Sequence, residues 1–92
     1  MAKSLRYKDG SPEDLARVKC SILADLGRGY QEDNNVTVGQ VVNDVWNDLD
    51  VSLVGCGEKH TLRRIVVVRQ ALTEMGLDET STTKVEDYFT NF

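Results

Sequence analysis

Apolar residues recur at helical spacing in three separate stretches of the chain. The first stretch carries one apolar stripe, made of Leu15, Val18, Ile22 and Leu26. Ser11 and Pro12 precede this stripe as a side-chain cap and a first-turn proline. Because Gly27 and Gly29 weaken the far end of the pattern, the sequence predicts a helix over residues 12–28.

The second stretch begins with a capping box. Thr37 stands three residues before Gln40, so its hydroxyl can accept a backbone N–H while the Gln40 side chain reaches back. The apolar face that follows consists of Val38, Val41, Val42, Val45, Trp46 and Leu49. These signals predict a second helix over residues 37–50.

The third stretch, residues 58–76, has no proline and no glycine before Gly76. The β-branched run 65–68 alone would suit a buried strand, but the uninterrupted length favours a helix that ends at a glycine. Its apolar positions cover most of the helix circumference, which predicts that this is the most buried of the three helices.

Both ends of the chain leave alternatives open. Residues 1–10 alternate polar with apolar and predict an N-terminal arm or a short edge strand. Residues 81–92 suit a short helix or a strand of a C-terminal hairpin. With no linker in view, residues 1–92 predict a single, mainly helical all-α domain of three to four helices.

Composition narrows the class of protein. A chain of 92 residues has a limited core, so we expect a homo-oligomer, most simply a dimer. The net charge of −4 opposes general binding to nucleic acid. The sequence contains no apolar run long enough to predict a membrane-spanning helix. The two cysteines lie far apart, and there is no export signal, so a cytoplasmic location with reduced thiols is expected.

Four cationic or titratable side chains gather at the start of the third predicted helix: Lys59, His60, Arg63 and Arg64. Cations there oppose the positive end of the helix dipole, which indicates an anion or nucleic-acid contact. The alternative is that these side chains pair internally with Asp44, Asp48 and Asp50, or extend from a buried helix into solvent.

The outer face of the second predicted helix is acidic and polar. It carries Asn43, Asp44, Asn47 and Asp48, with Asp50 close behind. This face predicts a contact with a basic protein partner, although an ordinary solvated face explains the same residues. Near the end of the sequence, Tyr88, Phe89 and Phe92 are candidates for self-association or for packing on the core.

Catalytic motifs are absent from the sequence. Cys56 and His60 are the nearest to a dyad, but they offer neither a third catalytic member nor enough ligands for zinc, and Cys20 reads as a small packing residue. We therefore expect no enzyme activity, no metal and no cofactor.

The function predicted on this basis is that of a self-associating, regulatory or inhibitory protein-interaction module that acts through charged helix faces. One alternative is a DNA-binding regulator, since the element order resembles winged-helix and ribbon-helix-helix proteins. The other is an acidic inhibitor that mimics nucleic acid.

Overall fold

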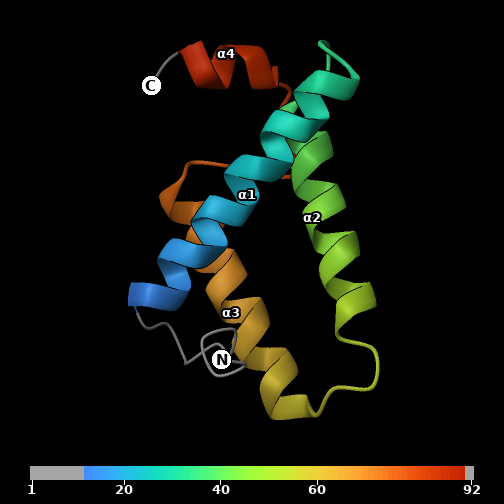
Figure 1. Cartoon of the computed structure of the whole chain (residues 1–92), viewed down its shortest axis with the longest axis vertical. Helices are drawn as coiled ribbons and strands as arrows, with labels where there is room; N and C mark the ends of the chain where they lie inside the picture. Colours follow the sequence, from blue (N-terminus) through green and yellow to red (C-terminus); the bar gives the residue numbers. More distant parts are fainter. Residues whose placement is uncertain (1–11, 91–92) are drawn as a thin grey trace.

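The computed structural model describes residues 12–90, which fold into helices with connecting turns (Figure 1). The helices are α1 (Pro12–Glu32), α2 (Val38–Ser52), α3 (Glu58–Glu74) and α4 (Val85–Thr90). Within this part of the chain, β-type pairing is limited to one isolated bridge between Thr37 and Lys84. The all-α prediction is confirmed, and the predicted arm over residues 1–10 lies outside the described residues.

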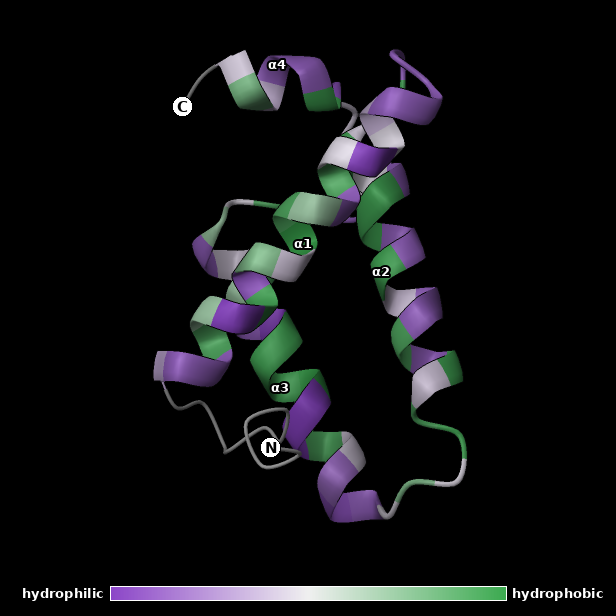
Figure 2. Ribbon diagram, in the orientation of Figure 1, coloured by the Kyte–Doolittle hydropathy of each residue, from purple (hydrophilic) through white to green (hydrophobic). Residues whose placement is uncertain are grey.

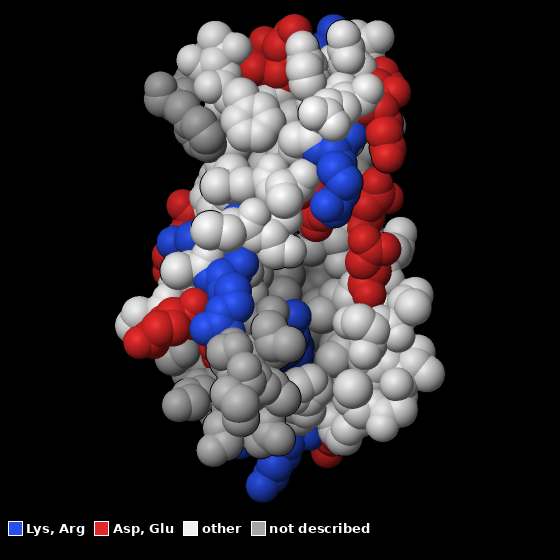
Figure 3. All heavy atoms as spheres, viewed as in Figure 1, with Lys and Arg blue, Asp and Glu red and all other residues white. Residues whose placement is uncertain are grey.

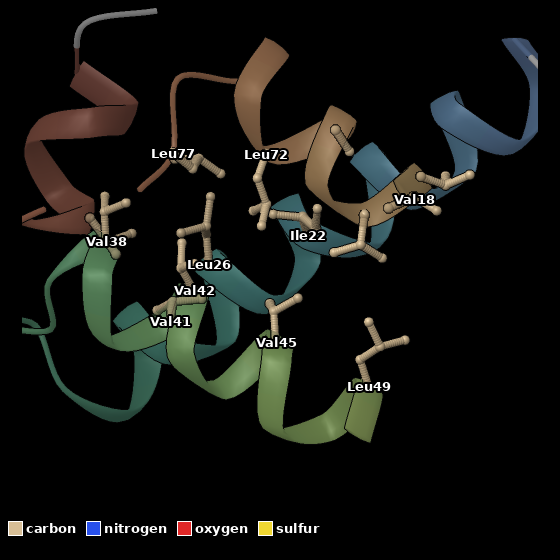
Figure 4. Close-up of a cluster of buried hydrophobic side chains, with 14 residues drawn as sticks. Val18, Ile22, Leu26, Val38, Val41, Val42, Val45, Leu49, Leu72 and Leu77 are labelled. Atoms are coloured by element: carbon tan, nitrogen blue, oxygen red, sulfur yellow. The ribbon is translucent and has the colours of Figure 1, made fainter. Parts of the chain in front are cut away.

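The long helix α1 holds the other helices together, since it packs against α2, α3 and α4. Buried apolar side chains from all four helices form one cluster, and Figure 4 shows several of them pointing toward one another. The cluster consists of Val18, Ile22, Leu26, Val38, Val41, Val42, Val45, Leu49, Val67, Val68, Ala71, Leu72, Leu77 and Val85. The apolar faces predicted for the first two helices therefore supply most of the core.

Helix α1 continues to Glu32, beyond the end predicted at residue 28. Gly27 and Gly29 lower the helix propensity there, but packing on α2 compensates. A Cβ at Gly29 would lie 3.0 Å from Val41 Cγ2, so glycine at this position lets α1 and α2 approach closely. Tertiary packing thus extends a helix that local propensity would end.

The first turn of α2 has the predicted capping box, in which the Gln40 amide donates to Thr37 Oγ1 and the Thr37 amide donates to Gln40 Oε1. A second set of partners comes from far along the sequence. The amides of Val38 and Gly39 donate to the carbonyls of Thr83 and Ser81, at 2.7 and 3.2 Å. The segment 79–85 therefore satisfies backbone donors that a helix start otherwise leaves unpaired.

The prediction that α3 is the most buried helix is wrong. Its buried residues are Val67, Val68, Ala71 and Leu72, all in the second half, whereas α2 has buried residues along most of its length. Figure 2 shows apolar residues on both halves of α3, so hydropathy alone did not reveal which half is covered. Residues 58–66 of α3 include no buried side chain.

The end of α3 follows the prediction more closely, although the helix stops at Glu74 instead of residue 76. Gly76 has a φ of 70°, and its amide and that of Leu77 donate to the carbonyls of Thr73 and Leu72. This is the Schellman arrangement, completed by the burial of both leucines.

Of the two alternatives for the C-terminal segment, the helix is correct at residues 85–90, which form α4. The predicted start at residue 81 is too early, because residues 81–84 are extended beside the first turn of α2. Val85 is completely buried, and its amide donates to the carbonyl of Val36 at 3.0 Å. This contact holds the start of α4 against the segment that precedes α2.

Candidate interaction surfaces

A groove opens where α1, α2 and α3 meet; we call it the central groove. Its volume is about 280 Å³, and its lining is Val18, Ser21, Ile22, Asp25, Val45, Asp48, Leu49, Ser52, Arg64 and Val68. The apolar members belong to the core cluster and form the floor. The volume is near the lower limit for drug-sized ligands, so the groove suits side chains of a larger partner better than a whole small molecule.

A smaller cavity of about 130 Å³ lies between α1 and α2. It is lined by four carboxylates, which we call the acidic seam: Asp25 and Glu32 of α1, and Asp44 and Asp48 of α2. Arg28 also lines it and forms an ion pair with Asp25. The space-filling view shows acidic side chains in a band along one side of the molecule (Figure 3).

The central groove and the acidic seam are one continuous surface. Asp25 and Asp48 line both cavities, so these two carboxylates stand at the junction between an apolar floor and an acidic strip. Figure 4 shows Val45 and Leu49 on the side of α2 that faces α1. An amphipathic ligand could therefore place apolar groups on the floor and cations against the carboxylates at the same time.

The structure divides the predicted acidic face of α2. Asp44 and Asp48 are one turn apart and belong to the acidic seam, while Asp50 lies about 120° around the helix from Asp44. Asn43 and Asn47 are exposed between these two directions. Of these five residues, only Asp44 and Asp48 line the acidic seam together with carboxylates of α1.

The predicted basic group at the start of α3 is also divided. Lys59 and Arg63 are exposed and one turn apart. Arg64, about 100° further around the helix than Arg63, turns into the central groove beside Asp25 and Asp48. His60 is exposed between these directions, so the four side chains do not form one face.

Apolar residues share the exposed side of α3 with the cations. Leu62 and Val66 have 57% and 59% of their surface exposed. Together with Lys59 and Arg63 they fall within about 100° on the helix, at positions i, i+3, i+4 and i+7. We call these four residues the α3 stripe.

Cys56 and His60 show no catalytic arrangement. Both are exposed, and the Cys56 thiol donates to the carbonyl of Ser52 at 3.8 Å. Among residues 12–90, no three His, Cys, Asp or Glu side chains form a group that could hold a metal ion. Cys20 is exposed, so its prediction as a packing residue is wrong.

Tyr88 and Phe89 pack within the chain, in an edge-to-face pair with ring centroids 5.8 Å apart. The Tyr88 hydroxyl donates to the carbonyl of Met75 at 3.1 Å, and burial raises the pKa of this phenol. Both rings are therefore partly buried against the core of their own chain, and their role in self-association stays a prediction. Phe92 lies outside the described residues.

A further cavity, of about 360 Å³, lies between α2, the end of α3 and the turn that follows. Arg69 stands over the Trp46 ring there, 5.3 Å from its centroid, and Asp78 and Glu79 also line the cavity. The amide of Thr80 donates to Asp78 and lowers the pKa of its carboxyl group. Arg69 thus already occupies the aromatic face that a cationic ligand would need.

Sequence reasoning missed part of the acidic seam and of the α3 stripe. Asp25 and Glu32 are polar residues of α1, seven apart, and their spacing places them on one side of the helix. Leu62 and Val66 are two of the apolar positions that led to the prediction of a largely buried helix over residues 58–76, because apolar residues are usually buried. Only the structure shows that these two positions face away from the core, since Ala71 on about the opposite side of the helix is completely buried.

Comparisons of the chain with protein-family models, with curated proteins and with solved structures found no match. Among helices of residues 12–90, none has the length and apolar character needed to cross a membrane.

Proposed function

We propose that this protein is a non-enzymatic protein-interaction module that binds a basic, amphipathic helix of a partner protein. The central groove receives the apolar side chains of that helix, and the acidic seam receives its Lys or Arg residues. The observation that carries this proposal is the shared position of Asp25 and Asp48, which line both cavities. Amphipathic helices recognise partners through this combination of an apolar groove and complementary charge.

The DNA-binding alternative receives less support from the geometry. It needs the cations of α3 to act together, but Arg64 turns into the central groove while Lys59 and Arg63 lie on the outside. A DNA-reading helix would also place exposed Leu62 and Val66 against a polar duplex.

The proposal is tested with two synthetic helical peptides that carry the same number of lysines, one with leucine and one with serine on the opposite face. We expect the Leu/Lys peptide to bind and to shift the backbone NMR signals of Val45, Leu49 and Val68. Substituting Asp44→Lys together with Asp48→Lys should weaken binding about ten-fold or more, because it reverses the charge of half the seam.

The matched control is Glu79→Lys with Asp87→Lys, which changes the net charge equally at exposed positions outside the groove. This control should bind like the wild type. Equal binding of the Ser/Lys peptide, or equal loss in the control, would reduce the interaction to general charge attraction and refute the proposal.

A further inference from the structure

The chain itself carries a helix with the chemistry that the groove requires. The α3 stripe combines two cations, Lys59 and Arg63, with two exposed apolar residues, Leu62 and Val66. We infer that the partner helix is the start of α3 from a second copy of this chain, so that the module self-associates by inserting the α3 stripe of one copy into the central groove of another. This inference rests on the proposed function.

The stripe cannot fill the groove of its own copy. Leu62 lies about 180° around α3 from Ala71, which is completely buried in the core. The stripe therefore points away from the cavity that α3 helps to line through Arg64 and Val68. A contact between stripe and groove must join two molecules.

The charges of the two surfaces are complementary. The acidic seam offers four carboxylates, of which Asp25 is paired with Arg28 within the chain. The stripe brings Lys59 and Arg63 one turn apart, the same separation along a helix as Asp44 and Asp48. Two cations at that spacing can face two aspartates at that spacing when the helices lie side by side.

The first half of α3 leaves apolar side chains in contact with solvent. Residues 58–66 include no buried side chain; Leu62 and Val66 are exposed, whereas Ile65 is half-buried against the core. Covering apolar groups that are exposed in the monomer lowers the free energy, because it removes apolar surface from water. The floor of the central groove offers the apolar surface that would do so.

Reciprocal charge reversal tests this contact directly. Variant A carries Lys59→Glu and Arg63→Glu, and variant B carries Asp44→Lys and Asp48→Lys. In A alone the stripe and the seam are both acidic, and in B alone the unchanged stripe and the two substituted seam residues are both basic, so each should fail to self-associate. An equimolar mixture places the acidic stripe of A against the basic seam residues of B and should associate again.

The measurement is the mass in solution by analytical ultracentrifugation, over a series of protein concentrations at low salt. The wild type should rise from the monomer mass of 10.3 kDa to at least twice that value, and A and B alone should stay at 10.3 kDa. Raising the salt concentration should weaken association, since it screens the pairs at the rim. Circular dichroism shows whether each variant keeps its helices.

A second variant tests the apolar part without changing any charge. Leu62→Ser with Val66→Ser alters two side chains that are exposed in the monomer, so the helix content should be retained. We expect its dissociation constant for self-association to rise about ten-fold or more. Glu79→Lys with Asp87→Lys should associate like the wild type.

Several results would overturn the inference: a wild type that stays monomeric, association that persists in A or B, or a mixture that remains monomeric. Binding of monomeric protein to phosphatidylglycerol vesicles through the stripe would assign the stripe to a lipid surface instead. If the wild type is monomeric while the Leu/Lys peptide still binds the groove, the proposed function stands and only self-association fails.

Discussion

Gly39 shows how one residue without a side chain positions a remote segment. A Cβ at this position would lie 2.6 Å from the carbonyl oxygens of both Glu79 and Ser81, which is closer than atoms can approach. Backbone oxygens on a segment that also bonds to Val38 and Gly39 cannot move aside without losing those hydrogen bonds. The sequence did not indicate this close contact, because the residues that flank Gly39 are those of an ordinary helix.

Substituting Gly39→Ala should therefore destabilise the protein by about 1–3 kcal/mol, as overpacking a filled site does. Urea unfolding followed by circular dichroism measures this change. Retention of wild-type stability would mean that segment 79–85 can leave the start of α2 at little cost.

At the scale of elements, α1 contains a pair of glycines with different surroundings. A Cβ at Gly27 would meet nothing within 4 Å, whereas one at Gly29 would lie 3.0 Å from Val41. Because both positions lie within α1, comparing the same substitution at each distinguishes the effect of helix propensity from the effect of packing.

We predict that Gly27→Ala raises the free energy of unfolding by about 0.5–1 kcal/mol, because alanine loses less backbone entropy in a helix. Gly29→Ala should gain less than this or lose stability, because Val41 is buried and has to shift. Urea unfolding of both variants provides the measurement. Equal stabilisation at both positions would contradict the assigned contact between α1 and α2.

Much of each helix could be predicted from its own residues. The capping box at Thr37 and Gln40 and the glycine after α3 appear in the structure because they depend on neighbours along the chain. The extension of α1 and the partial exposure of α3 could not be predicted, because they depend on which helix lies opposite. The candidate site follows the same rule: Asp44 and Asp48 were identified, but their association with Asp25 required the packing of α1 on α2.

At the scale of the whole molecule, an ion pair links α1 to the end of α3. Lys19 Nζ lies 2.5 Å from Glu74 Oε1, and Gln70 also donates to this carboxylate. The hydrogen bond from Lys19, and then that from Gln70, holds the pKa of Glu74 below its ordinary value. A lowered pKa in the folded state contributes stability above the pKa of the unfolded chain, and this stability is lost as the pH falls through the folded value.

We therefore expect Lys19→Met to raise the pKa of Glu74 toward its ordinary value, as measured by the carboxyl carbon signal in an NMR titration. The decrease in the urea midpoint between about pH 6 and pH 3 should also become smaller in this variant. The effect should be small, because both partners are partly solvated. An unchanged Glu74 titration would show that Lys19 does not hold this carboxylate in solution.

The contact between segment 79–85 and the start of α2 has a consequence for synthesis. The ribosome makes α2 before it makes the carbonyls of Ser81 and Thr83 and the amide of Val85, which bond to the region around Thr37. The first turn of α2 therefore acquires these partners only after more than forty further residues have been made, and a chain released before residue 81 would leave the amides of Val38 and Gly39 open to solvent. A protease should therefore cut such a truncated chain near the start of α2 faster than it cuts the full-length protein.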